Sequence, residues 1–242
     1  MNSKTDTVAV VWGAGGIGTA LATQIAAAGK YNQVVLVSRR KIELQGEGVR
    51  SVRADFLNEV SLAKTFKAIS KLGKISLLIV ATGLLHDDEL QPEKTIRQVS
   101  LEAFQKIFTV NVAGPALVAK HCAAHMPHKD RTVFAAISAR VGSISDNRLG
   151  GWYAYRASKS ALNMFIKTLS IEWQRRNPEC VCIGLHPGTV DTELSGPFQK
   201  GVKPDKLFTA SYAAGRLLEV IELKTAHESG NIFAFDGTKV PE

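Results

Sequence analysis

The sequence predicts an α/β fold: one doubly wound domain over residues 1–242, with a parallel sheet of about seven strands and helices on both faces. Two observations support this prediction. Short apolar runs rich in Val and Ile alternate with longer segments of helical period, which is typical of βαβ units. A chain of 242 residues, 45% of them hydrophobic, can bury one sizeable core, and no repeat or linker divides it.

The predicted elements alternate along the whole chain. Strands are expected at residues 8–12, 33–37, 49–54, 75–81, 131–137, 181–186 and 231–235. Helices are expected at residues 17–28, 61–71, 101–125, 153–174 and 210–224. In an open parallel sheet a ligand binds outside the carboxyl ends of the strands. Functional residues should therefore follow a strand directly or open the next helix.

The charge balance raises the question of an anionic partner. The formal net charge is +8, and nucleic acid is the partner that such a balance most often suggests. The basic residues are scattered, however, with only short pairs such as Arg39-Arg40 and Arg175-Arg176. No basic tract with interleaved aromatic residues suggests a groove that follows phosphates, so no nucleic-acid partner is expected.

The lengths of the apolar runs and the positions of the cysteines indicate in which compartment the protein works and whether it binds a membrane. No apolar segment follows the N-terminus, and none approaches the about 18 to 20 residues that span a bilayer, so we expect a cytoplasmic protein without a membrane partner. Cys122 stands alone, whereas Cys180 and Cys182 fall on one side of a predicted strand, where a disulfide framework is implausible. We interpret all three as core thiols and expect no metal site, although a weak metal or redox role stays open.

A glycine-rich turn directly follows the first predicted strand. Glycine permits a tight turn, lets a pyrophosphate approach N–H groups at a helix N-terminus, and allows the helix to pack closely on the strand. The alternative is a turn that is merely tight. The strand before it and the helix after it favour the nucleotide-binding turn of a Rossmann-type domain. The residues expected to contact the nucleotide are Gly13, Gly15, Gly16, Ile17 and Gly18.

The end of the second strand indicates which dinucleotide is bound. A protein that prefers NAD usually has an acidic side chain about 20 residues past the glycine motif, to hold the ribose 2′-hydroxyl. This sequence has Ser38, Arg39 and Arg40 there. Guanidinium groups match phosphate oxygens in charge and geometry, so these residues predict NADP (NADPH) as the cofactor. The alternative is a solvated loop in which the nearby Glu43 neutralises one arginine.

Two further strand ends contribute to the predicted nucleotide site. Asp55 follows the third strand, where it could accept a hydrogen bond from the adenine amino group or cap the next helix. Ala81, Thr82 and Gly83 follow the fourth strand, where bulky side chains would collide with a bound nucleotide.

The segment at residues 151–162 has the clearest catalytic pattern. Tyr155 and Lys159 are spaced i and i+4, so both face the same way on one helix, whereas Tyr153 points to a different face. Moving a phenol pKa from about 10 toward neutrality requires about 4 kcal/mol of preferential stabilisation of the phenolate. A cation one turn away in a partly dry cleft is a source of much of that stabilisation. The alternative is an ordinary surface pair.

Four motifs occur in an order that resembles the short-chain dehydrogenase/reductases. They are Gly13-Ala14-Gly15-Gly16-Ile17-Gly18, Asn111-Val112-Ala113-Gly114, Tyr155-Arg156-Ala157-Ser158-Lys159 and His186-Pro187-Gly188-Thr189-Val190-Asp191-Thr192. The resemblance covers nearly the whole chain. Residues 139–147 and the closing Phe235-Asp236-Gly237 resemble the C-factor and sniffer-like carbonyl reductase branch.

The resemblance implies a role for each motif residue. Tyr155 would be the general acid that protonates a carbonyl oxygen as hydride leaves the nicotinamide. Lys159 would lower the tyrosine pKa and hold the ribose hydroxyls. Asn111, in the middle of a long helix, would hold a water that connects Lys159 to solvent; the alternative is a side chain that satisfies local backbone groups. The nicotinamide would be bordered by Pro187, Gly188, Val190 and Thr192.

The sequence departs from the family pattern at two places. The family usually places a substrate-positioning serine three residues before a glycine, and Gly142 puts Ala139 at that place. We assign the role to Ser138, with Ser143 or neither residue as alternatives, although Ser138 requires an irregular backbone to face the substrate. The glycine motif is also one residue shorter than usual and begins with Trp12 in place of threonine.

These features predict an NADP(H)-dependent oxidoreductase that reduces an aldehyde or ketone, or oxidises the alcohol, of a small-molecule substrate. The alternative is an NADP-binding sensor or signalling protein with little turnover, which the C-factor resemblance and Ala139 both permit. The short segment at residues 193–209, broken by Gly and Pro, indicates an open substrate site. Because the family commonly pairs the helices after strands four and five, a homodimer is expected first and a tetramer second.

Overall fold

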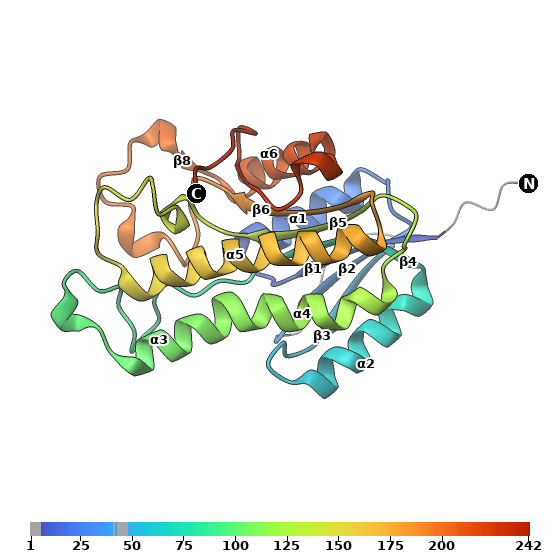
Figure 1. Ribbon diagram of the computed structural model, residues 1–242, viewed down its shortest axis with the longest axis horizontal. Helices are drawn as coiled ribbons and strands as arrows, with labels where there is room; N and C mark the ends of the chain where they lie inside the picture. Colours follow the sequence, from blue (N-terminus) through green and yellow to red (C-terminus); the bar gives the residue numbers. More distant parts are fainter. Residues whose placement is uncertain (1–5, 41, 43–47) are drawn as a thin grey trace, which may run out of the picture.

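The computed structural model describes residues 6–40, 42 and 48–242 (Figure 1). Within this part of the chain, the main sheet has seven parallel strands in the order β3-β2-β1-β4-β5-β6-β9. They are β1 (Thr7–Trp12), β2 (Gln33–Ser38), β3 (Val49–Arg53), β4 (Lys74–Val80), β5 (Thr132–Ile137), β6 (Cys180–His186) and β9 (Ile232–Ala234). The strand order reverses beside β1, so the predicted doubly wound α/β fold is confirmed.

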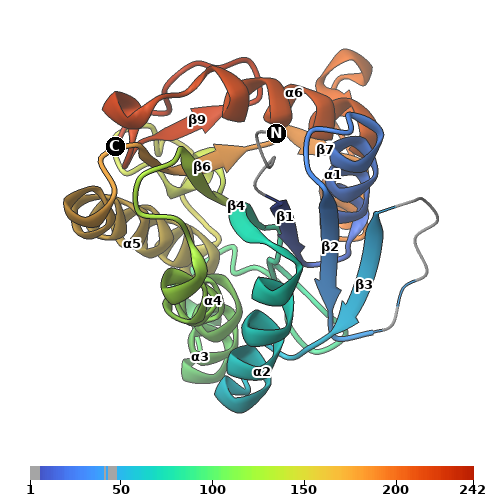
Figure 2. The same ribbon diagram turned by 90° about the vertical axis from the view of Figure 1, so that its right-hand side faces the viewer.

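Helices cover both faces of this sheet (Figure 2). One face carries α1 (Gly16–Ala27) and α6 (Ala210–Leu223), which pack against each other. The other face carries α2 (Glu59–Ile69), α3 (Leu101–Phe108), α4 (Gly114–Cys122) and α5 (Tyr153–Arg176). The first turn of α2 is capped by Asn58, whose side chain accepts a hydrogen bond from the Ser61 N–H at 3.0 Å.

Alternate residues of a central strand enter different cores. Val8, Val10 and Trp12 of β1 belong to the apolar cluster under α2, α4 and α5. Ala9 and Val11 belong to the cluster under α1 and α6. Because successive side chains of a strand point to opposite faces, a strand that is apolar throughout is expected where both faces are covered. This burial fixes the positions of the strand ends that hold the site.

The helical segment predicted at residues 101–125 contains a local change of geometry. Between α3 and α4 lies one π-helical segment, Thr109–Ala113, and a 3₁₀ turn, Ala123–His125, completes the segment. Single π turns inside α-helices often occur at functional sites, and this one contains Asn111. By length and composition, Leu101–His125 is also apolar enough to cross a membrane, with 39% of its most apolar window buried. The expectation that no apolar segment is long enough to span a bilayer is therefore wrong. Helices in the core of a soluble protein can have the same length and composition.

The region around residues 193–209, predicted as a short segment broken by Gly and Pro, has more regular structure than the sequence predicted. The short strands β7 (Thr189–Val190) and β8 (Leu207–Phe208) form a separate parallel pair. Between them lie 3₁₀ turns at Gly196–Phe198 and Pro204–Lys206. Strands of two residues leave no periodic pattern, so sequence could not indicate them.

Candidate active site

The glycine-rich turn forms a narrow cradle between β1 and α1. Gly13 has a φ of +108°, and a Cβ atom there would lie 2.9 Å from the carbonyl carbon of Ala81. A Cβ atom at Gly18 would lie 1.8 Å from the carbonyl oxygen of Gly13, so only glycine fits. Gly15, in contrast, is exposed, and no described atom lies within 4 Å of its Cβ position. The turn is therefore closed toward the protein and open toward solvent.

The N-terminus of α1 can receive an anionic group in this cradle. Its capping residue, Gly15, has no side chain, and the first turn of α1 carries no acidic group. The N–H groups of a first helical turn have no partner within the helix and attract phosphate. Thr82 lies against Gly13, and its buried hydroxyl has no hydrogen-bond partner among the described residues. These features fit the pyrophosphate of a dinucleotide, while the predicted contact residue Ile17 is half-buried against the α1 and α6 cluster.

The chain that follows β6 also reaches this turn. A Cβ atom at Gly16 would lie 2.9 Å from Cγ2 of Thr192. The Thr192 hydroxyl donates to the carbonyl oxygen of Val190 at 3.3 Å, and Val190 is buried. Gly188 has a φ of +77°, and a Cβ atom there would lie 2.7 Å from the Phe208 ring. The segment expected to border the nicotinamide, including the buried Pro187, is therefore folded tightly beside the glycine turn.

A cavity of about 420 Å³ lies at the carboxyl ends of β2 and β3. Arg39, predicted to hold a 2′-phosphate, lines it together with Arg53, which the sequence analysis missed. Arg53 pairs in register with Ser38 across β2 and β3, a relation that only the strand pairing reveals. Arg40 is not among the lining residues, and its carbonyl oxygen accepts a hydrogen bond from the Ser38 hydroxyl. Glu43 lies outside the described residues.

Asp55 also lines this cavity, and one of its two predicted roles is wrong. Its Oδ1 accepts a hydrogen bond from the Leu57 N–H at 2.9 Å. The cap of α2 is Asn58 instead, because Asp55 lies too far before the helix. Contact of Asp55 with adenine stays a prediction.

Tyr155 and Lys159 face one buried region, as their spacing predicts. They are 7% and 2% exposed, whereas Tyr153 is 37% exposed on another face of α5. The Lys159 Nζ atom lies 5.6 Å from the centroid of the Tyr155 ring and donates to the carbonyl oxygen of Ile137 at 3.0 Å. It also lies 3.7 Å from the Cβ position of Gly83, which is van der Waals contact with the chain after β4. The ends of β4 and β5 therefore meet at this pair.

Both groups of the pair have shifted pKa values. Burial raises the pKa of the Tyr155 phenol above its ordinary value of 10.0. Burial also lowers the pKa of Lys159 to about 8. The family resemblance instead implies that the Lys159 cation lowers the tyrosine pKa. Burial is the cause of both shifts, since removal from water penalises the charged form of each group. A lowering of the tyrosine pKa by Lys159 stays a prediction.

Asn111 is fully buried and connects the loop after β4 to α5. Its Oδ1 accepts from the Leu84 N–H at 2.7 Å, and its Nδ2 donates to the Leu84 carbonyl at 2.9 Å and to the Ser158 hydroxyl at 3.0 Å. The Ser158 hydroxyl in turn donates to the carbonyl oxygen of Tyr155 at 2.7 Å. The alternative role, satisfaction of backbone groups, is thus observed. A water bound toward Lys159 stays a prediction.

Both candidate serines have hydrogen-bond partners within the protein. The Ser138 hydroxyl donates to Oδ1 of Asn163 at 2.6 Å. The Ser143 hydroxyl accepts from the Asp146 N–H at 3.1 Å and donates to the carbonyl oxygen of Glu242 at 3.4 Å. Ala139 opens a 3₁₀ turn, Arg140–Gly142, with an extended backbone. Either serine would have to exchange its present partner to reach a substrate, so its role stays a prediction.

Aromatic side chains gather beside Tyr155. The Trp152 ring lies edge-on to Tyr155 at 6.1 Å and to Phe198 at 5.0 Å between centroids. His86 lies 5.4 Å from Phe198, and its Nε2 is 3.2 Å from the carbonyl oxygen of Leu194. His86 thus joins the loop after β4 to the region of residues 193–209, and the sequence did not indicate this contact. The rings of His86, Phe198 and Trp152 therefore form a cluster of aromatic contacts that ends at Tyr155.

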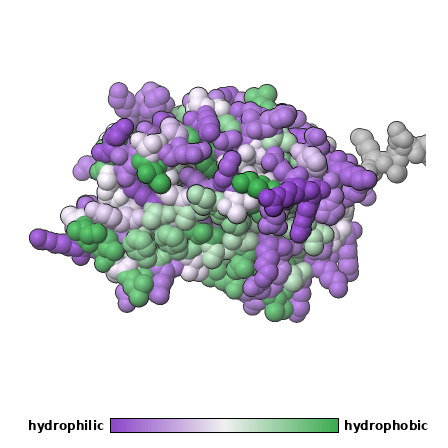
Figure 3. Space-filling view, viewed as in Figure 1, coloured by the Kyte–Doolittle hydropathy of each residue, from purple (hydrophilic) through white to green (hydrophobic). Residues whose placement is uncertain are grey.

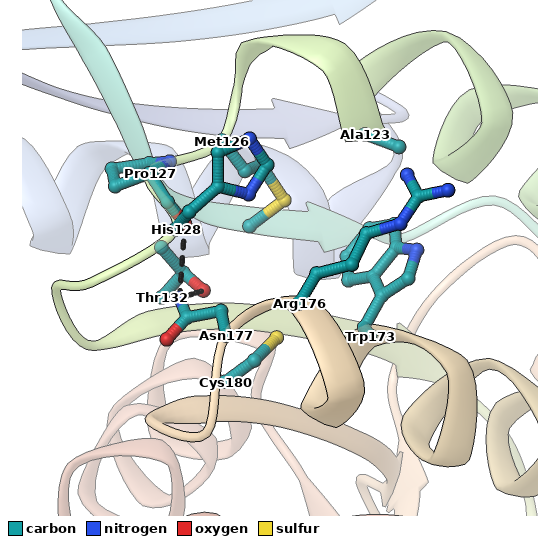
Figure 4. A pocket seen from close by; sticks show the side chains of 9 residues that line it. All are labelled: Ala123, Met126, Pro127, His128, Thr132, Trp173, Arg176, Asn177 and Cys180. Atoms are coloured by element: carbon teal, nitrogen blue, oxygen red, sulfur yellow. Dashed lines mark hydrogen bonds between the residues drawn. The ribbon is translucent and has the colours of Figure 1, made fainter.

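A second cavity lies at the opposite, amino end of β5 and β6 (Figure 4). Its volume is about 20 Å³, which suits about one water molecule and no nucleotide. Cys180 lines it and lies 3.8 Å from Cys182 between Sγ atoms, while all three cysteines are free and buried. Among the described residues, no group of three or more His, Cys, Asp or Glu side chains could hold a metal ion.

The fold and the site define a dinucleotide-binding α/β oxidoreductase. A family model described as short chain dehydrogenase matches residues 7–203. The chain belongs to the short-chain dehydrogenase/reductase family, which confirms the resemblance inferred from the motifs.

A relative similar to C-factor and solved structures of the same fold agree with the resemblance to the C-factor and sniffer-like branch. C-signal of Myxococcus xanthus is 34% identical over 137 residues, covering 56% of this chain and 76% of that protein. Benzil reductase ((S)-benzoin forming) of Bacillus subtilis is 24% identical over 236 residues, 90% of this chain and 93% of its own. The carbonyl reductase Sniffer of D. melanogaster has a TM-score of 0.83 and 21% identity, covering 98% of this chain and 100% of that chain. NADPH-bound carbonyl reductase from chicken fatty liver has a TM-score of 0.81 and 22% identity, with 98% and 99% covered.

Proposed function

We propose that the protein is an NADP(H)-dependent carbonyl reductase that reduces an aldehyde or ketone, or oxidises the corresponding alcohol. The observation that carries this proposal is the buried Tyr155–Lys159 pair at the carboxyl edge of the sheet, beside the glycine cradle. A proton-transfer group and a nucleotide site at one sheet edge are what hydride transfer to a carbonyl requires.

Tyr155 is the group that moves the proton. The phenol is protonated at neutral pH, since burial holds its pKa at or above the ordinary value, and it is therefore in the form that can donate a proton. Its hydroxyl protonates the carbonyl oxygen, and the ammonium group of Lys159 stabilises the phenolate that remains. When bound, NADPH supplies the hydride from its nicotinamide ring. The reverse steps oxidise an alcohol, with the phenolate as general base.

The choice of NADP over NAD rests on Arg39 and Arg53. Both line the cavity at the ends of β2 and β3. Asp55 is the one acidic residue among the described residues that line this cavity. Guanidinium groups bind phosphate through charge-assisted hydrogen bonds, so two of them favour a 2′-phosphate over a 2′-hydroxyl. The NADPH-bound carbonyl reductase from chicken agrees with this proposal in its cofactor and in its reaction class. The benzil reductase relative agrees with it in reaction class.

A signalling protein with little turnover is the second candidate. Similarity to C-signal and the alanine at position 139 favour it. The two candidates make different predictions for NADPH consumption over a panel of aldehydes and ketones. The enzyme consumes NADPH with at least one of them, and Tyr155→Phe removes that activity. Tight NADPH binding without any turnover would instead favour the signalling role, whereas full activity in Tyr155→Phe would contradict the mechanism.

We also propose a homodimer, with a tetramer as the larger alternative. Figure 3 shows apolar side chains gathered over the face that carries α3, α4 and α5. Leu101, Met164 and Ile171 are exposed there at 73%, 66% and 47%. A symmetric interface would cover this surface, and sedimentation analysis measures the mass of the assembly directly.

A further inference from the structure

The loop between β4 and α3 contains an unusual buried charge, Glu93. Its side chain is 2% exposed, and among the described residues only Lys159 is a comparably buried charged group. An ionised carboxylate is costly to bury unless hydrogen-bond donors replace water. The partners of Glu93 therefore indicate why the carboxylate is placed there.

Glu93 holds the first turn of the catalytic helix at two points. Its backbone carbonyl accepts a hydrogen bond from the Trp152 N–H at 2.5 Å. Its carboxylate oxygens lie 3.3 and 3.4 Å from the N–H of Ala154, which directly precedes Tyr155. The capping residue of α5, Trp152, makes no side-chain cap of its own. A carboxylate at a helix N-terminus also interacts favourably with the helix dipole.

The backbone beside this contact is strained. Trp152 has a φ of 52°, and it is the sole non-glycine residue in the described ranges with a positive φ. Gly150 and Gly151 before it have φ values of 63° and 65°. A bulky residue in this conformation persists only where its surroundings fix it, and such residues cluster at functional sites. Here the surroundings are Glu93 on the backbone and Tyr155 with Phe198 on the ring.

We propose that Glu93 is a positioning residue for Tyr155: it fixes the start of α5, and with it the phenol and the Trp152 ring beside the phenol. A helix cap needs only a Ser, Thr, Asn or Asp at position 152. A carboxylate from another loop instead ties the chain after β4, which contains Gly83, to the helix that carries the catalytic pair. The inference rests on the proposed carbonyl reductase function.

The test compares three variants of the full-length protein with the wild type. Glu93→Met fills the same space without accepting a hydrogen bond, and Glu93→Gln retains an acceptor oxygen. Glu89→Ala is the matched control, because Glu89 lies in the same loop with its side chain 88% exposed. The measurements are kcat and KM with a carbonyl substrate, the NADPH dissociation constant, and hydrogen exchange of the first-turn amides of α5.

Glu93→Met should lower kcat about tenfold or more, because a small displacement of a catalytic group is costly, and should leave NADPH affinity within about twofold. Exchange at Ala154 should accelerate, while exchange in the distal turns of α5 stays unchanged. Glu93→Gln should retain most of kcat, and Glu89→Ala should match the wild type. If Glu93→Met does not fold, Glu93→Asp, which withdraws the carboxylate by one methylene, has the same expected outcome.

Two results would overturn the inference. One is an unchanged kcat in a folded Glu93→Met protein, and the other is unchanged exchange at Ala154. A fall in NADPH affinity as large as the fall in kcat also counts against it, because it indicates general loss of structure. The exchange measurement needs no turnover. An inactive wild type therefore contradicts the carbonyl reductase function, while the contact between Glu93 and α5 is still tested.

Discussion

The Nζ atom of Lys159 lies 5.6 Å from the centroid of the Tyr155 ring, and both side chains are almost fully buried. Burial acts on the two groups in opposite directions, raising the pKa of the phenol and lowering that of the ammonium group. In both cases the neutral form is favoured, because transfer from water penalises charge. In the proposed reaction, Tyr155 therefore holds its proton until a substrate takes it.

Removing the phenolic hydroxyl should abolish most of the activity while leaving cofactor binding intact. General acid catalysis contributes about 10²- to 10⁴-fold to a rate, so Tyr155→Phe should lower kcat by that factor. NADPH affinity should stay within about twofold, because the ring remains packed on Trp152. Steady-state kinetics and fluorescence titration check the two halves of this prediction. A parallel loss of NADPH affinity would show that Tyr155 acts mainly in binding.

Lys159 should make the folded protein more stable as the pH rises. Burial lowers its pKa from 10.5 to about 8, so between these pH values the unfolded chain binds a proton that the folded protein has released. The free energy of unfolding then increases with pH, by at most about 3 kcal/mol over the whole interval. Above pH 10 the raised pKa of Tyr155 acts in the opposite direction.

The measurement is denaturant unfolding at pH 8 and pH 10 for the wild type and for Lys159→Met. The three thiols titrate in both proteins, so the difference between the two slopes isolates Lys159. The free energy of unfolding should rise more steeply between pH 8 and pH 10 in the wild type than in Lys159→Met. Equal slopes would mean that Lys159 keeps an ordinary pKa in the folded protein.

The elements that the sequence predicted well are those with a local signal. The central strands β1, β2, β4, β5 and β6 are largely apolar runs, whereas the edge strand β3 is mixed. The i, i+4 spacing placed Tyr155 and Lys159 on one face without knowledge of the fold. The structure added residues whose roles depend on contacts between distant segments. Arg53 reaches the cavity of Arg39 only through strand pairing, and Glu93 reaches Ala154 across 61 positions. No pattern within one segment reports such contacts.

Arg39 and Arg53 should set the preference for NADPH. Hydrogen bonds to charged groups contribute about 1.5 to 3 kcal/mol, so Arg39→Ala and Arg53→Ala should each weaken NADPH binding by about 10- to 100-fold. Binding of NADH, which lacks the 2′-phosphate, should change little. Arg40→Ala is the matched control, since Arg40 does not line the cavity. Titration with both nucleotides checks the prediction, and equal losses for NADH would exclude a phosphate contact.

Two glycines of the cradle should respond differently to the same substitution. Gly18→Ala places a Cβ atom 1.8 Å from a backbone oxygen, so the turn must move. Such overpacking costs typically about 1 to 3 kcal/mol of stability. Gly15→Ala meets no described atom within 4 Å and should leave the unfolding temperature nearly unchanged. It should nevertheless weaken NADPH binding, because the methyl group occupies the open side of the cradle. Wild-type affinity in Gly15→Ala would place the pyrophosphate elsewhere.

Ala139→Ser tests whether the catalytic pair works without a serine partner. The position opens a 3₁₀ turn with an extended backbone, φ −153° and ψ 150°, so serine fits without strain. The hydroxyl of the neighbouring Ser138 is already donated to Asn163. A new hydroxyl at position 139 would add one hydrogen bond to the substrate, which corresponds to about a 2- to 12-fold gain in kcat/KM. Ser138→Ala supplies the opposite test. If Ser138 positions the substrate, its removal lowers kcat/KM by about tenfold, while Ala139→Ser has no effect. The opposite pair of results would show that position 139, and not Ser138, faces the substrate.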